Sequence, residues 1–150
     1  MPTELKLRRL KTIKPISLGV TYTHRDENFL YFDGWSGAEE KHRWTEGKSV
    51  SILFKIDQIN ALPAQVSIDI VVFPLKIQHA HFLLNNKSKL SLIISQPTQI
   101  SLQINKSDFI EGVNELSITL PDAQQPGNGD SRMLALAIQK FLIGQTGKMI

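Results

Sequence analysis

The stretch SVSILFKID, residues 49–57, decides the fold class of this chain. Its apolar residues recur at every second position, and this period of two is typical of a β-strand that buries one face. Four side chains are therefore expected to point into a core: Val50, Ile52, Phe54 and Ile56. The opposite face of such a strand is expected to meet water.

The same alternation recurs along the chain, between clusters of turn-forming residues. Clear examples occupy residues 65–73, 89–95, 98–105 and 114–120, and weaker ones occupy residues 17–23, 29–33 and 77–84. Long amphipathic helices do not alternate with these strands, which argues against a parallel α/β sheet. The pattern predicts an all-β fold, a jelly-roll-like antiparallel β-sandwich of about ten strands.

One stretch, RMLALAIQKFLI at residues 132–143, fits two kinds of secondary structure. In a strand, Leu134, Leu136 and Ile138 would share one face, whereas helical spacing would align Leu134 with Ile138 and Phe141. Intrinsic propensity favours the helix. The all-β context favours a last strand that closes the sandwich, and we predict a strand.

The length of 150 residues suits a single domain. We expect a basic leader over residues 1–16, a β-sandwich over 17–143 and a tail over 144–150, with both ends candidates for poor order. The net charge is +3, and lysines and arginines cluster within residues 6–14. This cluster has no aromatic residue for base stacking, so we expect a solvated leader and no nucleic-acid partner. Contact with an acidic membrane surface or partner is the alternative.

Several classes of protein are excluded by what the sequence lacks. The chain has no cysteine, which excludes disulfides, thiolate metal sites and cysteine nucleophiles. Its N-terminal residues are too charged for a secretory signal, and no run approaches the ~20 apolar residues of a transmembrane helix. We therefore expect a cytoplasmic protein without a transmembrane segment.

No spacing that carries a catalytic mechanism is present. The chain has no phosphate-binding loop, nucleophile elbow or zinc-protease motif. His79 and His81 would share one face of a strand, but no third metal ligand is recognisable nearby, so we expect no metal site. Acidic residues for a glycosidase pair exist, but the sequence does not pair them. We expect no catalytic residues, no cofactor and no enzyme activity.

The stretch GWSGAEEKHRWT, residues 34–45, contains both tryptophans of the chain around a charged centre. Aromatic faces stack on the apolar faces of sugar rings, and charged side chains bind hydroxyl groups in pairs. The candidate ligand-binding residues are Trp35, Glu39, Glu40, His42, Arg43 and Trp44. The structural alternative is a corner in which the tryptophans fill the core and an Arg–Glu pair ties the loop to the sandwich.

Three segments stand out together in chain order. The first runs from Gly34-Trp35 through Glu39 to Trp44-Thr45, the second is VNELSITLPDA at residues 113–123, and the third covers residues 127–138. Over residues 31–143 their order and spacing resemble the β-sandwich accessory domain attached to bacterial glycosyltransferases of surface-polysaccharide synthesis. The chain departs from that family in having Ala135 where a glycine is usual, and in containing no transferase domain.

This resemblance implies a jelly-roll-like fold and a non-catalytic accessory role. We expect carbohydrate recognition or scaffolding in bacterial surface-glycan synthesis, with a glycan or a glycosyltransferase of a nucleotide-sugar pathway as partner. A protein–protein interaction module without sugar binding is the alternative, and a glycan hydrolase is the distant one.

The third segment also suggests a structural ion pair. An arginine inside an apolar last strand is costly unless it is paired. We expect Arg132 to pair with Glu39 across the sandwich, with Asp130 as the local alternative. If this pair were buried, removing Arg132 would cost several kcal/mol, because a carboxylate would be left without its partner.

Overall fold

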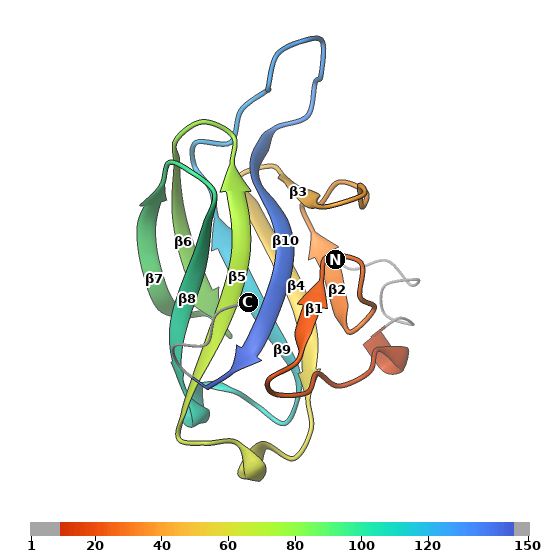
Figure 1. The fold of residues 1–150 in the computed structure, drawn as a ribbon, viewed down its shortest axis with the longest axis vertical. Coiled ribbons are helices and arrows are strands. Elements are labelled where there is room, and N and C mark those ends of the chain that lie inside the picture. The colour runs from red at the N-terminus through yellow and green to blue at the C-terminus, as the bar shows by residue number, and fades with distance from the viewer. Residues whose placement is uncertain (1–9, 146–150) are drawn as a thin grey trace.

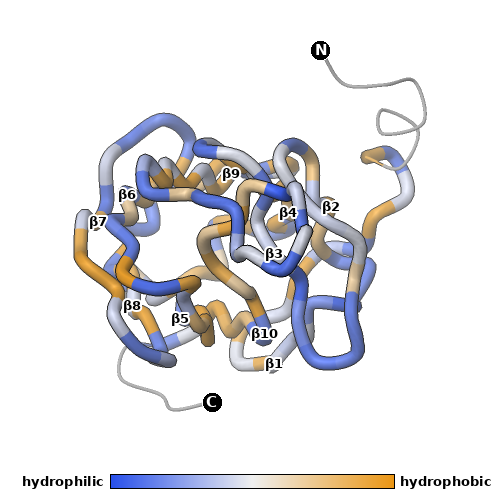
Figure 2. Tube along the Cα trace, turned by 90° about the horizontal axis from the view of Figure 1, so that it is seen from above, coloured by the Kyte–Doolittle hydropathy of each residue, from blue (hydrophilic) through white to orange (hydrophobic). Residues whose placement is uncertain are grey.

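The computed structural model describes residues 10–145. Within these residues, ten strands form two antiparallel sheets that pack face to face, as Figure 1 and the view from above in Figure 2 show. Sheet A consists of β1 (Thr21–Thr23), β3 (Arg43–Glu46), β5 (Gln65–Pro74), β8 (Thr98–Asn105) and β10 (Leu134–Gly144). Sheet B consists of β2 (Phe29–Asp33), β4 (Ser49–Ile56), β6 (Gln78–Leu84), β7 (Lys87–Ile94) and β9 (Gly112–Thr119).

The order of the strands makes the sandwich jelly-roll-like, as predicted. Sheet A runs β1-β10-β5-β8 with β3 also paired to β10, and sheet B runs β2-β4-β9-β6-β7. In the described chain every connection between consecutive strands crosses from one sheet to the other, except the β6–β7 hairpin. Asn85 and Asn86 in this hairpin have φ values of 49° and 67°, the left-handed conformation that a tight hairpin turn needs.

The ambiguous stretch at residues 132–143 forms strand β10, which confirms the prediction of a last strand. β10 pairs with β5 along one edge and with β1 and β3 along the other. Backbone hydrogen bonds on both edges therefore outweigh the intrinsic preference of this stretch for a helix. Arg132 is not inside the strand, since β10 begins at Leu134.

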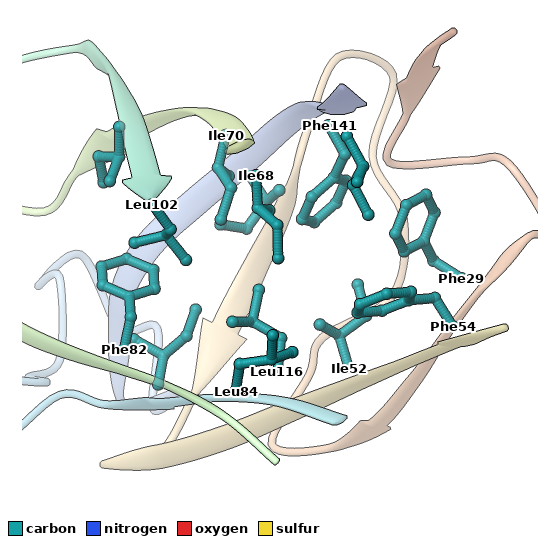
Figure 3. Close-up of a cluster of buried hydrophobic side chains, with 14 of the residues drawn as sticks. Phe29, Ile52, Phe54, Ile68, Ile70, Phe82, Leu84, Leu102, Leu116 and Phe141 are labelled. Carbon is teal, nitrogen blue, oxygen red and sulfur yellow. The ribbon is translucent and has the colours of Figure 1, made fainter. Parts of the chain in front are cut away.

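The core lies between the two sheets, where Figure 3 shows side chains such as Ile68 and Phe141 of sheet A facing Ile52 and Phe54 of sheet B. The four residues expected to point inward from β4 are each at most 2% exposed. Each such side chain contributes about 1.5–3 kcal/mol when it leaves water. The period-two pattern therefore identified the core face of this strand.

The expectation that the other face of every strand meets water is wrong for β4 and β5. Behind β4, Leu53 is covered by Leu30 and Ile13 in a second, smaller hydrophobic cluster. On β5, Ser67 and Asp69 are fully buried, and Asp69 accepts hydrogen bonds from the hydroxyls of Ser67 and Ser101. Chain segments that pack on the outside of a sheet cannot be recognised from the period of a single strand.

The ends of the chain are described only in part. Residues 1–9 of the predicted leader and residues 146–150 of the predicted tail lie outside the described residues. The described part of the leader contacts the sandwich, since Ile13 and Ile16 are buried. None of the helices in residues 10–145 has the length and apolarity to cross a membrane.

Candidate functional site

The stretch at residues 34–45 forms a hairpin that leads from β2 into β3, beside β10 in Figure 1. The amide of Ser36 donates to the carbonyl of Trp44 at 3.0 Å, and the amide of Glu39 donates to the carbonyl of His42 at 2.8 Å. Successive side chains of β3 point to opposite sides of sheet A. The hairpin therefore has an inner side, toward sheet B, and an outer side.

Trp35 and Arg43 belong to the inner side. The indole N–H of Trp35 donates to the carbonyl of Ser51 at 2.7 Å, and its ring meets the Tyr31 ring edge-on at 4.8 Å. Arg43 Nη1 donates to the carbonyl of Ser36 at 3.0 Å, and its guanidinium carbon lies 4.2 Å from the centre of the Tyr31 ring. Both predicted ligand-binding residues are thus engaged in holding the hairpin to the sandwich.

Tyr31 is the platform for these two contacts. Burial raises the pKa of its phenol above the usual range, although the nearby Arg43 opposes this effect. The ring therefore remains neutral at all ordinary pH values, and the interaction with Arg43 is that of a cation with an aromatic face.

Three aromatic side chains meet on the outer side, and we call them the aromatic cluster: His42, Trp44 and Phe73. Their ring centres are 5.1–5.8 Å apart, and each pair of rings is nearly perpendicular. Trp44 and Phe73 flank Ala137 in the pairing register, so they lie on the same face of sheet A. All three rings are only half-buried, which leaves part of the cluster accessible to a ligand.

A cleft of about 390 Å³ adjoins the aromatic cluster. It is lined by Thr23, His24, Arg25, Glu40, Lys41, Gln139 and Lys140. The cleft and the cluster share two elements, because the Glu39–His42 turn contributes to both and β10 passes beneath both. Of the predicted ligand-binding residues, Glu40 lines the cleft, while His42 and Trp44 belong to the cluster.

Glu39 is the hairpin residue that faces the loop before β10. Its carbonyl accepts a hydrogen bond from Arg25 Nη2 at 2.8 Å, and its carboxylate is 3.5 Å from His42 Nε2. The carboxylate is also 3.9 Å from Arg132 Nη1, at the limit of an ion pair. Glu39 therefore supports the turn that carries Glu40 and His42.

Asp130, rather than Glu39, is the main partner of Arg132. Arg132 Nη2 lies 2.7 Å from Asp130 Oδ2, and its Nε donates to Asp130 Oδ1 at 3.0 Å. These hydrogen bonds lower the pKa of Asp130 to about 2. The expected contact between Arg132 and Glu39 is present at 3.9 Å, but the two side chains are 36% and 47% exposed, so the pair is not buried. Arg132 precedes β10, and its side chain pairs with Asp130 of the preceding loop at the protein surface.

This geometry predicts a small effect of removing Arg132. We expect Arg132→Ala to lower the melting temperature by no more than a few degrees, because exposed ion pairs contribute little to stability. Glu39→Ala serves as the matched comparison and should change it less, given the 3.9 Å separation. Calorimetry of both variants tests this, and a loss of about 10 °C or more for Arg132→Ala would contradict it.

The two histidines considered as a metal pair lie on the outer face of sheet B. His79 Nδ1 is 2.6 Å from Asp122 Oδ2, and His81 Nε2 is 2.7 Å from Ser88 Oγ. Across residues 10–145, no group of three or more His, Cys, Asp or Glu side chains is arranged to hold a metal ion. The structure therefore gives each histidine a protein partner of its own.

Sequence reasoning missed Phe73, His24, Gln139 and Lys140. A signal for Phe73 was present, since it follows Val72 in a strand whose even-numbered residues face the core. A single aromatic residue on the outer face of a strand is not unusual, and it becomes informative only when neighbours such as Trp44 and His42 join it in one apolar patch. No comparable signal marked the cleft, because its walls come from β1, the hairpin and β10, which are far apart in sequence.

Comparisons with known proteins bear on the fold. No protein-family model and no curated protein matches the chain. A family 35 carbohydrate-binding module from an environmental isolate matches with a TM-score of 0.54 at 12% identity, over 85% of this chain and 94% of that module. A family 35 module from Paenibacillus barcinonensis matches with a TM-score of 0.50 at 10% identity, over 85% of this chain and 100% of that one.

The fold also matches part of a larger enzyme. A glycoside hydrolase family 43 arabinoxylan arabinofuranohydrolase from Bacillus subtilis, solved with cellotetraose, has a TM-score of 0.53 at 12% identity. The match covers 89% of this chain but only 28% of that enzyme. At these identities the likeness concerns the fold alone. The chain therefore has the β-sandwich fold that carbohydrate-binding modules of family 35 also have.

Proposed function

We propose that this protein is a non-catalytic carbohydrate-recognition module whose ligand stacks on the aromatic cluster. The observation that carries the proposal is the cluster itself: three half-buried rings on the outer face of sheet A, next to a polar cleft. The accessible parts of such rings offer apolar surface to a sugar ring, while neighbouring polar groups bind its hydroxyls. The carbohydrate-binding modules with the same fold support this at the level of architecture.

The rigid scaffold suits this role. Trp44 and Phe73 belong to β3 and β5, which both pair with β10, and Ala137 between them leaves room for the two rings. A binding surface held on strands loses little conformational entropy when a ligand arrives. Association with a glycosyltransferase in surface-glycan synthesis stays a prediction that rests on the sequence resemblance.

The proposal predicts that truncating either large ring weakens glycan binding. Once a glycan array has identified a ligand, we expect Trp44→Ala and Phe73→Ala each to reduce its affinity about tenfold, which corresponds to ~1.4 kcal/mol of lost stacking. Isothermal titration calorimetry measures the change. The fluorescence of Trp44 should also respond to the ligand, and this is tested in a Trp35→Phe variant, where Trp44 is the only remaining tryptophan.

Ile93→Ala is the matched control, because Ile93 is 60% exposed on the outer face of sheet B and its truncation should leave affinity unchanged. A folded protein that binds no glycan on the array would refute carbohydrate recognition. That outcome would favour the alternative, a protein–protein interaction module.

A further inference from the structure

The cleft beside the aromatic cluster carries an excess of positive charge. Arg25, Lys41 and Lys140 line it, against the single carboxylate of Glu40. Lys41 and Lys140 are exposed, and neither forms an ion pair with another of residues 10–145. A cleft lined mainly by one sign of charge attracts ligands of the opposite sign.

His24 adds a buried, neutral ring to the wall of this cleft. It lines the same cleft and is only 2% exposed, yet within the described part of the chain its Nδ1 has no hydrogen-bond partner. Burial lowers the pKa of His24, and a hydrogen bond with the backbone of Glu40 only partly offsets this. The neutral ring has one bare acceptor nitrogen when its other nitrogen donates. This nitrogen is itself closed to solvent, so the cleft offers a ligand its cationic side chains rather than the imidazole nitrogen.

The cleft is also within reach of the aromatic cluster. Ala137 lies beneath the cluster and Lys140 lines the cleft, three residues further along β10, so the two are about 10 Å apart at the rise of an extended strand. On the hairpin, Lys41 directly precedes His42 of the cluster. A short oligosaccharide stacked on the cluster can therefore place a substituent in the cleft.

We infer that the ligand is an acidic saccharide, whose sugar ring stacks on the aromatic cluster while its anionic group lies in the cleft near Lys41 and Lys140. This inference rests on the proposed function. The anion can be the carboxylate of a uronic or sialic acid, or a sulfate or phosphate ester, because lysine ammonium groups bind each of these as point charges. Arg25 contributes less directly, since it already donates to the Glu39 carbonyl.

The experiment compares acidic glycans with their neutral counterparts on one array, in low salt. The array carries uronic-acid, sialylated, sulfated and phosphorylated glycans, and which of them binds distinguishes the sources of the anion. We expect the tightest binding to an acidic glycan, with affinity falling several-fold between 0.05 and 0.5 M NaCl, because salt screens exposed charges. Affinity for a neutral glycan should barely change.

Charge variants then test the cleft directly. The double variant Lys41→Gln/Lys140→Gln should weaken binding of the acidic glycan about 3- to 10-fold, given the modest strength of exposed ion pairs. Glu40→Gln should strengthen it about twofold, because the variant removes the one carboxylate of the cleft. Lys14→Gln/Lys48→Gln is the matched control: it makes the same charge change at exposed lysines outside the cleft and should alter affinity little.

The outcomes separate this inference from the proposed function. Equal binding of acidic and neutral glycans, or unchanged affinity in Lys41→Gln/Lys140→Gln, would overturn the acidic ligand and leave carbohydrate recognition standing. Binding of no glycan at all would overturn both. Loss of affinity in the control variant to the same extent would show that only net charge matters, and would also overturn the site.

Discussion

Gly34→Ala is expected to lower the free energy of unfolding by about 3–5 kcal/mol, the larger of the two main effects that we predict. Gly34 has φ +79°, a left-handed conformation that side chains disfavour. A Cβ at this position would lie 2.7 Å from the carbonyl oxygen of Ser49 and 2.9 Å from that of Glu46. Both obstacles are backbone atoms, so neither can move aside without disturbing the start of β4 or the end of β3.

The matched control for this prediction is Gly37→Ala, in the same hairpin. Gly37 has no positive φ, and a Cβ there would have no neighbour within 4 Å. Urea unfolding followed by circular dichroism gives both values, and we expect Gly37→Ala to stay within about 0.5 kcal/mol of the wild type. Equal stability of the two variants would contradict the argument from backbone conformation.

Asn114→Ala is expected to cost about 3 kcal/mol, because Asn114 is fully buried and its side chain joins three segments. Its Oδ1 accepts from the amide of Ile110 and from Asn85 Nδ2, both at 2.9 Å. Its Nδ2 donates to the carbonyls of Ile110 and Gly112 at 3.0 and 3.1 Å. Removing the amide would leave these groups without partners where water cannot replace it.

Asn60→Ala is a suitable control for the loss of an asparagine side chain, since Asn60 is exposed in the 3-10 helix η1 (Ile59–Ala61). We expect it to change the unfolding free energy by less than about 0.5 kcal/mol. Asn114→Asp keeps the size but puts an oxygen that cannot donate against the carbonyls of Ile110 and Gly112, so it should be no more stable than the alanine variant. An alanine variant as stable as the Asn60→Ala control would show that the buried hydrogen bonds contribute nothing net.

Gly34 and Asn114 belong to two of the three segments that stood out in the sequence, and the structure gives a physical reason for each. Gly34 and Trp35 begin the hairpin because the glycine permits the turn and the indole then reaches the carbonyl of Ser51. Asn114 holds the β8–β9 connection against sheet B, because its side chain forms hydrogen bonds with the backbone of Ile110. Both positions stood out in the sequence, but the reason for each is a contact with residues that lie elsewhere in the chain.

The candidate site was predictable only in part. Trp44, His42 and Glu40 were named from residue types in one short stretch, and the structure places them at or beside the aromatic cluster. Trp35 and Arg43 come from the same stretch but lie on its inner side. A list of residue types does not contain the direction of each side chain, which depends on where the hairpin begins and how β3 pairs with β10.

The sequence by itself determined the all-β class, most of the strands and the core face of β4, because the period of two is a local property that burial imposes on every strand. It also favoured the strand at residues 132–143 through its all-β context. Only the tertiary structure decided the second buried faces of β4 and β5, the choice of Asp130 as partner of Arg132, and the meeting of Phe73 with Trp44 across Ala137. Apart from the Asp130–Arg132 pair, whose members are two residues apart, these contacts join residues that are distant along the chain. Their existence depends on pairing register and on which segments cover a sheet, and the pattern of a single strand encodes neither.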